Sequence, residues 1–387
     1  MTDATTPPGP AGRVILDAGG RAPLLPEARA AFLEALDQGW ADPRRLFSEG
    51  RRARMLLDGA REAIAAVVGA RTEEIDLAPS HVAALHTAVR SVARGRRRVG
   101  AAVVVSAVER AAVLNAAAFV AGDARAVVPV DAAGRVDPAA FAAALAVPGV
   151  ALAALQHANG EVGTLQPLDE VHAAARVAGV PLLVDAGASL GHVEPSSTWD
   201  VLAADAGDWG GPAGIGVLAT RRGVRRSPDG PEDDDRWFPG GVSVPAALAA
   251  AVALQVAEQR RAAEAQRLHA LVDRVRERVA AEVPDVEVVG DPHRRLPHVV
   301  TFSCLYVDGE ALVTALDAEG FAVGSGSACT SSALEPSHVL AAMGVLTHGN
   351  VRLALPPGTT EQDVDAFCDA LPRLVARVRS ALGVEGL

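Results

Sequence analysis

Short apolar runs alternate with Ala-rich segments along the first part of the chain. The runs AAVVVSA (101–107), VALAALQH (150–157) and PLLVDAG (181–187) are nearly uninterrupted, which is typical of strands buried on both faces. Helical segments of about a dozen residues separate them. The pattern predicts an α/β fold in which helices cover a mainly parallel sheet.

A long helical signal follows this region. Residues 245–283 contain mostly Ala, Arg, Glu and Leu, with no Gly and only one Pro near their start, so we expect one helix that bridges two domains. Beyond it, strand-like HVVTFSC and VRLAL alternate with helical GEALVTALDAEG and TEQDVDAFCDALPRLVARVRSAL. We therefore predict a disordered tail over 1–12, a large α/β domain over 13–245, and a linker helix with a small α+β domain over 246–387.

Two polar residues end buried runs of the predicted sheet. His157 closes the second run, and Asp185 lies near the end of the third. Ligands of parallel sheets bind at the carboxyl ends of the strands. Both residues are therefore candidates for a functional site.

Charge and cysteine usage narrow the function classes. The net charge of −11 argues against a nucleic-acid partner. No apolar run reaches the length of a membrane span, and the N-terminus lacks the basic start of a signal peptide. Cys304, Cys329 and Cys368 fit neither a disulfide framework nor a paired metal-ligand motif. We expect a cytoplasmic protein without a membrane or nucleic-acid partner.

One residue type is absent from the sequence. All 36 basic residues are Arg, and the chain contains no Lys. No side-chain amine is therefore present to form a Schiff base with an aldehyde cofactor.

A glycine- and serine-rich loop surrounds one of the three cysteines. In GSGSACTSSALEPSHVLAAMG (324–344), small neighbours suit a Cys329 thiol that swings and reacts, whereas Cys304 and Cys368 have the apolar neighbours of packing cysteines. The loop resembles the active-site loop of group-I cysteine desulfurases, which supply sulfur for iron–sulfur clusters and tRNA thiolation on the class-V aminotransferase fold. VILDAGGRAPLLPEA, FSEGRRAR, QHANGEVGTLQP, LLVDAGASLGH and NVRLALPPGTTEQDVD resemble further segments of that family in order and spacing.

The resemblance carries expectations about fold and roles. It implies the fold type I of pyridoxal phosphate (PLP) enzymes, with a seven-stranded sheet in the large domain, and a dimer. By similarity, Cys329 matches the sulfur-carrying nucleophile and Arg352 the residue that binds the substrate carboxylate. Asp185 matches the partner of the pyridine nitrogen, and Asn159 the first Asn of the family's His-Val-Asn-Asn-Glu.

Other positions depart from the family pattern. Asp208 stands where the family has the Schiff-base Lys, with Asp205 and Gly207 at the Ser and His of the same stretch. The remaining departures are Ser80 and His81 in the phosphate loop, Arg110 at the ring-stacking His, Gly160 at the second Asn, Ala188 at a Gln, and Gly241 at the phosphate-binding Thr of the neighbouring subunit. The sequence therefore predicts a vestigial cofactor pocket without PLP.

Four hypotheses follow. The first is a sulfur-transfer or iron–sulfur protein without PLP catalysis, in which Cys329 accepts persulfide sulfur or ligates a cluster, with a desulfurase, a cluster scaffold or a sulfur acceptor as partner. The second is a non-catalytic subunit in a heterodimer with an active desulfurase. The third, an active PLP-dependent desulfurase that converts L-cysteine to L-alanine and persulfide, is disfavoured by the missing Lys. The fourth is an emptied pocket that binds another small molecule through Arg110 and Arg352.

Overall fold

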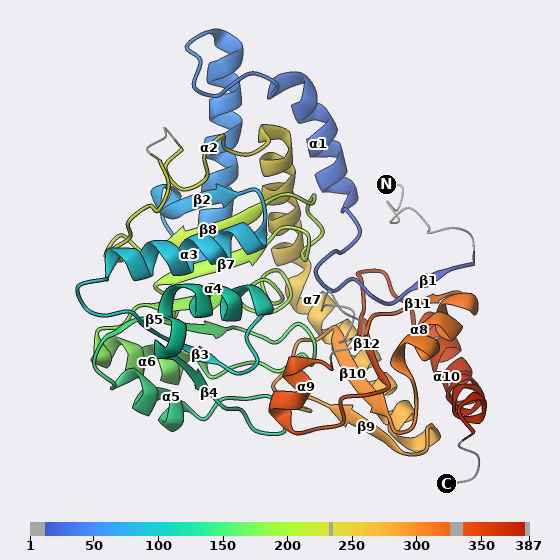
Figure 1. The fold of residues 1–387 in the computed structure, drawn as a ribbon. Coiled ribbons are helices and arrows are strands. Elements are labelled where there is room, and N and C mark those ends of the chain that lie inside the picture. Colours follow the sequence, from blue (N-terminus) through green and yellow to red (C-terminus); the bar gives the residue numbers. More distant parts are fainter. Residues whose placement is uncertain (1–11, 232–234, 326–335, 384–387) are drawn as a thin grey trace.

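The central element of the fold is a seven-stranded sheet. The structure is a computed structural model that describes residues 12–231, 235–325 and 336–383 (Figure 1), so nearly all of the predicted tail and the Cys329 position lie outside the described residues. In sheet order the strands are β2 (Ile75–Ala78), β8 (Gly216–Thr220), β7 (Val201–Asp205), β6 (Leu182–Asp185), β5 (Val150–Gln156), β3 (Ala102–Ser106) and β4 (Arg125–Val128). Only β8 runs antiparallel to its neighbours, which confirms the predicted mainly parallel sheet.

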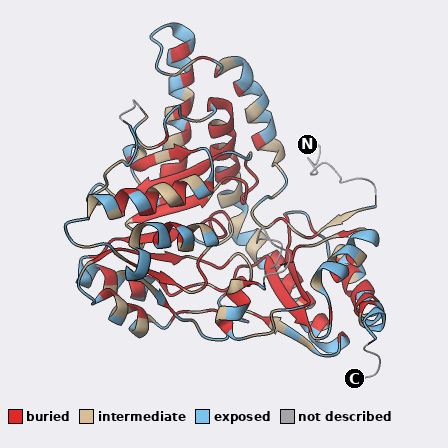
Figure 2. Ribbon diagram, in the orientation of Figure 1, coloured by how far each residue is buried: buried red, intermediate tan, exposed pale blue. Residues whose placement is uncertain are grey.

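Helices cover both faces of this sheet. They are α1 (Pro26–Gln38), α2 (Ser48–Val68), α3 (His81–Gly95), α4 (Ala111–Ala121), α5 (Pro138–Leu145) and α6 (Leu168–Ala178), with short 3₁₀ turns at Thr72–Glu74 and Gly122–Ala124. Successive strand residues enter opposite cores: Leu182 and Val184 pack in one cluster and Leu183 in the other. Figure 2 shows the resulting buried strands between helices that are exposed on their outer sides.

One long helix packs against both hydrophobic cores of the chain. Helix α7 (Val244–Glu282) has 39 residues and is therefore about 58 Å long. Its first part, including Leu254, packs in the core of the large domain, and its later part, including Leu271 and Val275, packs in the core of the small domain. The helix thus fixes the two domains relative to each other.

The small domain contains a three-stranded antiparallel sheet and helices. Its strands are β9 (Val286–Val289), β10 (Val299–Cys304) and β12 (Asn350–Ala354), and its helices are α8 (Gly309–Ala318), α9 (His338–Met343) and α10 (Glu361–Ala381). The predicted division differs at the N-terminus, because β1 (Val14–Ile15) pairs in parallel with β11 (Phe321–Ala322). Leu16 packs in the small-domain core, so the first described residues close the small domain before the chain enters the large one. Within the described ranges, no helix is long and apolar enough to cross a membrane.

Candidate functional site

Asp185 is the centre of the candidate site at the carboxyl end of β6. Its side chain is 4% exposed, and both of its oxygens are engaged. Nε2 of His81 lies 3.0 Å from Oδ1, which also accepts the amide of Gly187 at 2.8 Å, and Nε of Arg110 donates to Oδ2 at 3.1 Å. Burial alone would raise the pKa of Asp185, but the charges of His81 and Arg110 outweigh it and hold this pKa well below its ordinary value.

The start of α3 places His81 against Asp185. Ser80 caps the helix, because its Oγ accepts the amide of Ala83 at 3.1 Å, and His81 is then the first helical residue. The imidazole packs tightly on the turn after β6. A Cβ added to Gly187 would lie only 2.2 Å from Cε1 of His81, so the ring needs a glycine at this position.

Arg110 stands immediately before α4 and reaches Asp185 from the other side. The charges of Asp185, Asp208 and Asp205 all act on its guanidinium and, against burial, raise the pKa of Arg110. Four charged side chains predicted for the vestigial pocket are therefore brought together. Three of the four are carboxylates, so the pocket carries more negative than positive groups around this arginine.

Asp208, in the turn after β7, forms a hydrogen bond with the N-terminal segment. Its Oδ1 accepts the amide of Gly20 at 2.7 Å, and next to it Gly207 and Gly210 accept backbone amides of the N-terminal segment from Ala22 and Leu25. Asp208 is 3% exposed, and its Oδ2 is buried without a hydrogen-bond partner in the described part of the chain. Burial raises the pKa of this carboxyl. Asp208 thus helps to fasten the N-terminal segment across the site.

Asp205 and Gly207 belong to the same turn. Oδ1 of Asp205 accepts the amide of Gly207 at 3.0 Å, which makes a local side-chain-to-backbone turn at the end of β7. His192 approaches from the segment after β6, with Nε2 3.0 Å from the carbonyl oxygen of Asp208. The ring of His192 stacks on His298 at a centroid distance of 3.9 Å.

Arg352 lies on β12, at the junction between the two domains. Its Nη2 donates to Oδ1 of Asp17 at 3.0 Å. Two glycines pack closely against this ion pair. A Cβ added to Gly324 would lie 2.7 Å from Oδ2 of Asp17, and a Cβ added to Gly19 would lie 3.2 Å from Cζ of Arg352. The guanidinium is therefore held by an acidic neighbour at the N-terminal segment.

The remaining predicted residues have varied surroundings. Asn159 is a turn residue, since its Oδ1 accepts the amides of Glu161 and Val162 and its Nδ2 donates to the carbonyl of Val108. Ala188 and Gly160 face each other, because a Cβ at Gly160 would meet that of Ala188 at 3.2 Å.

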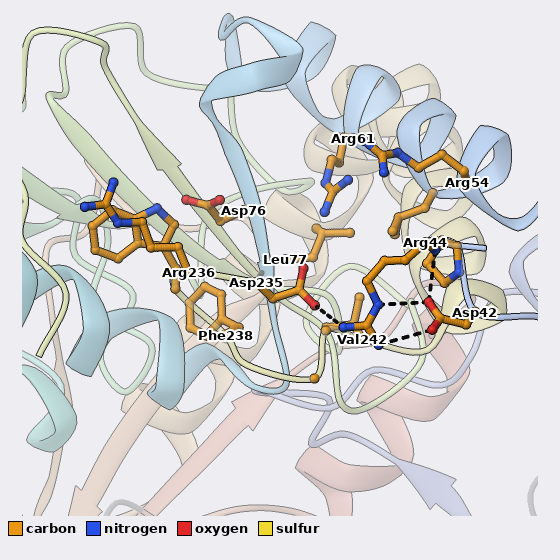
Figure 3. Close-up of a pocket in the computed structure, with 15 residues that line it drawn as sticks. Asp42, Arg44, Arg54, Arg61, Asp76, Leu77, Asp235, Arg236, Phe238 and Val242 are labelled. Carbon is orange, nitrogen blue, oxygen red and sulfur yellow. Dashed lines mark hydrogen bonds and ion pairs between the residues drawn. The ribbon is translucent and has the colours of Figure 1, made fainter. Parts of the chain in front are cut away.

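Gly241 lies in a different region, a cavity of about 640 Å³ whose lining is drawn in Figure 3. There Arg44 pairs with Asp42 and Asp235, and Arg54 and Arg61 of α2 line the same cavity. The structure thus separates Gly241 from the Asp185 cluster within this chain.

Two residues near the Asp185 cluster have strongly shifted pKa values. Glu109 is fully buried beside Arg110 and accepts Ser106 Oγ and the amide of Gln156; burial raises its pKa to about 7. The signal for it was an acidic residue three positions after the buried strand β3, and it was missed. Burial lowers the pKa of His157 to about 4, which favours its neutral form at neutral pH.

The described cysteines are packing residues. Cys304 and Cys368 are buried in the small-domain core, and burial raises the pKa of each thiol to about 11. Their thiols are therefore poor nucleophiles at neutral pH, as expected from their apolar neighbours.

Comparisons with known proteins agree with the fold. The family model described as aminotransferase class-V matches residues 14–367. Cysteine desulfurase IscS of Dictyoglomus turgidum is 32% identical over 377 residues, covering 95% of each chain. The chain belongs to the group-I cysteine desulfurase family. Cysteine desulfurase NifS of Azotobacter vinelandii is also 32% identical, over 95% of this chain and 94% of its own. A solved structure titled "NIFS-LIKE PROTEIN" has the same fold, with a TM-score of 0.86 at 22% identity over 94% of this chain and all of that chain.

Membership of this family connects the chain to sulfur transfer. Cysteine desulfurases are PLP-dependent, so PLP is the cofactor that the family leads one to expect. Whether the residues of this chain fit PLP depends on the cluster around Asp185.

Proposed function

We propose that this chain is a sulfur-transfer protein of the cysteine desulfurase family that does not use PLP. The observation that carries the proposal is the state of Asp185, whose two carboxylate oxygens are engaged by His81 and Arg110. In the family this carboxylate is expected to pair with the cofactor's pyridine nitrogen. In this chain, Nε2 of the His81 imidazole lies beside that carboxylate, in the place where the family would have the pyridine nitrogen.

The other residues of the pocket also fit PLP poorly. An aldimine needs an amine, and the chain has Asp208 in place of the Lys and no Lys elsewhere. The Asp208 carboxylate is committed to the amide of Gly20. Phosphate binding is opposed by the excess of carboxylates, since two unit charges 4 Å apart repel by about 4 kcal/mol at an effective dielectric constant of 20. We therefore assign no catalytic step to PLP in this chain.

Cys329 is the residue through which we propose that sulfur passes. Its thiolate would attack the outer sulfur of a desulfurase's cysteine persulfide, so that a new S–S bond forms at Cys329. The persulfide's own S–S bond breaks, and the donor cysteine leaves as a thiolate. The step transfers one sulfur atom with its proton and needs no external oxidant. The same thiolate is a suitable ligand for a cluster shared with a scaffold protein. Both roles require a reduced thiol, in keeping with a cytoplasmic protein.

The experiment for this proposal measures sulfur on Cys329 directly. The purified protein is mixed with an active desulfurase and L-cysteine, and persulfides are detected by thiol alkylation and mass spectrometry. We expect a mass increase of one sulfur on the peptide containing Cys329, and none when the desulfurase is omitted. Cys368→Ser is the matched control, because that thiol is buried and should leave the labelling unchanged. Absence of persulfide from Cys329, with the desulfurase active, would refute the sulfur-carrier role.

A second candidate function is a non-catalytic subunit in a dimer. Large apolar side chains are exposed together on α1, on α2 and between them: Leu33, Leu36, Trp40, Leu46, Phe47 and Met55. Leu46 is 87% exposed and Trp40 68%, and such groups of apolar residues mark protein interaction surfaces. Sedimentation of the protein alone and with a desulfurase distinguishes a homodimer from a heterodimer. Under this reading Cys329→Ser has no effect on the partner's activity, whereas the sulfur-carrier reading predicts loss of transfer.

A further inference from the structure

The cavity of about 640 Å³ drawn in Figure 3 lies between α2, β2 and the segment that precedes α7. Its size is typical of sites for small organic molecules. The apolar part of its lining consists of Leu57, Leu77, Trp237, Phe238 and Val242. No charged residue of the Asp185 cluster lines it, so the cavity is distinct from the vestigial cofactor pocket.

Two arginines of the cavity share one carboxylate. Arg54, Asp58 and Arg61 follow one another at spacings of four and three residues, so their side chains lie on one face of α2. Nε of Arg54 donates to Oδ2 of Asp58 at 3.0 Å, and Nη1 of Arg61 donates to Oδ1 at 3.1 Å. Neither arginine forms another hydrogen bond or ion pair with a described residue. The Arg54–Asp58–Arg61 group therefore carries one positive charge in excess.

The unused donors of both arginines are accessible. A guanidinium has five N–H groups, and each of these two uses a single one on Asp58. The side chain of Arg54 is 58% exposed and that of Arg61 26%, and Arg61 has no nitrogen atom that is both buried and without a partner. Figure 3 shows both guanidinium groups on the α2 side of the cavity, with Phe238 and Val242 on the other side. A ligand in the cavity therefore reaches free N–H groups of both arginines.

Two of the acidic residues in the lining are already paired. Asp42 accepts hydrogen bonds from Nε and Nη2 of Arg44, and it also pairs with Arg45 at 3.5 Å. Arg44 in turn lies 4.0 Å from Asp235, as Figure 3 shows. Two carboxylates thus face two guanidinium groups, and this part of the cavity has no net charge.

The third acidic residue of the lining, Asp76 on β2, is neutralised by Arg226. Nη1 and Nη2 of Arg226 both donate to Oδ2 of Asp76 at 3.2 Å, and the same guanidinium lies 4.0 Å from the ring centroid of Trp237. Arg236 also lines the cavity, and it forms no ion pair within the described ranges. The lining therefore has an excess of positive charge, although the whole chain has a net charge of −11.

We propose that this cavity binds a small organic carboxylate, with the carboxylate group of the ligand at Arg54 and Arg61. The planar fork of a guanidinium matches the two oxygens of a carboxylate, and the excess charge of the Arg54–Asp58–Arg61 group is opposite to that of the ligand. The apolar lining suits a hydrocarbon or aromatic body, because its transfer from water is favourable. The site therefore selects acids over alcohols of the same shape, and alcohols over amines.

The test uses three probes of one shape: phenylacetate, 2-phenylethanol and 2-phenylethylamine. Binding to the full-length protein is measured by isothermal titration calorimetry and by saturation-transfer NMR, at low ionic strength because salt screens exposed charges. We expect phenylacetate to bind at least about tenfold more tightly than the alcohol, and the amine to bind least. Acetate has the charged group without the ring, so it should bind more weakly than phenylacetate.

Two substitutions in the Arg54–Asp58–Arg61 group should change binding in opposite directions. Arg61→Gln leaves Arg54 and Asp58 as a neutral pair, so it should abolish the preference for phenylacetate over the alcohol. Asp58→Asn removes the carboxylate that competes with the ligand, so it should tighten the binding of phenylacetate. Arg52→Gln is the matched control, because Arg52 is an exposed arginine of the same helix that does not line the cavity. It should leave phenylacetate binding unchanged.

The outcomes that overturn the proposal are distinct. They are that no probe binds at millimolar concentration, that the alcohol or the amine binds as tightly as phenylacetate, or that Arg52→Gln weakens phenylacetate binding as much as Arg61→Gln does. If Arg61→Gln does not fold, Asp58→Asn decides, because unchanged or weaker binding of phenylacetate to that variant also overturns the proposal. The proposal does not depend on sulfur transfer, which concerns Cys329.

Discussion

Replacing His81 by Ala tests whether the imidazole really takes the place of a cofactor ring beside Asp185. The two side chains are 3% and 4% exposed, and Nε2 of His81 lies 3.0 Å from Oδ1 of Asp185. Removing one partner of a buried pair costs about 3–5 kcal/mol. Arg110 and the amide of Gly187 remain on the carboxylate, so we expect the lower end, about 3 kcal/mol.

The assay is urea-induced unfolding followed by tryptophan fluorescence. All four Trp residues, at positions 40, 199, 209 and 237, belong to the large domain, so the signal reports the unfolding of that domain. His86→Ala is the matched control, because His86 is half-buried on the same helix. We expect it to change the free energy of unfolding by less than about 1 kcal/mol.

The pH dependence of this difference has a definite sign. The folded-state pKa of Asp185 is lowered, so its stabilising contribution is present above its unfolded pKa of about 4 and is lost as pH falls through the folded value. The destabilisation by His81→Ala should therefore persist from neutral pH to about pH 4 and shrink below it.

Exogenous imidazole should bind in the space left by the truncated side chain and stabilise the variant. At ten times its dissociation constant this amounts to about 1.4 kcal/mol. If His81→Ala is no more destabilising than His86→Ala and imidazole has no effect on it, the proposed role of the His81 ring is refuted.

Three other substitutions test neighbouring parts of the site. Gly187→Ala should destabilise the protein by clashing with the His81 ring, and the double variant with His81→Ala should recover much of the loss in a double-mutant cycle. Because the raised pKa of Glu109 favours its protonated form in the folded state, the wild-type free energy of unfolding should fall by up to about 3 kcal/mol between pH 4.5 and 7. Glu109→Gln should not show this fall. Urea unfolding measured across this pH range checks it, and identical pH profiles for the two proteins would contradict it. Asp208→Leu should cost about 1–3 kcal/mol in urea unfolding, because the partly buried amide of Gly20 loses its acceptor. Asp208→Asn should cost less, and equal losses would contradict this.

The sequence was sufficient to predict the fold class, for identifiable reasons. Uninterrupted apolar runs predicted the strands around Asp185, and the absence of Gly and of further Pro after Pro245 predicted the domain-bridging helix. Pairing of β1 with β11 was not predictable, because two-residue strands carry no periodic signal and their partner lies about 300 residues away.

The contacts that define the candidate site depend on tertiary packing. Asp185 and Asp208 were identified by position, yet no local pattern indicated that His81 would reach Asp185 or that Asp208 would hold the amide of Gly20. Nor does the sequence alone indicate that Gly187 leaves room for the imidazole of His81.

The central claim is that the pocket of this desulfurase-family protein does not hold PLP. The most direct measurement is the absorbance spectrum of the purified protein after incubation with PLP and desalting, with the bound PLP quantified after release in alkali. We predict no band near ~420 nm and less than about one tenth of a PLP per chain, since no lysine is available for an aldimine. A retained band with one PLP per chain, together with sulfide release from L-cysteine, would contradict the account.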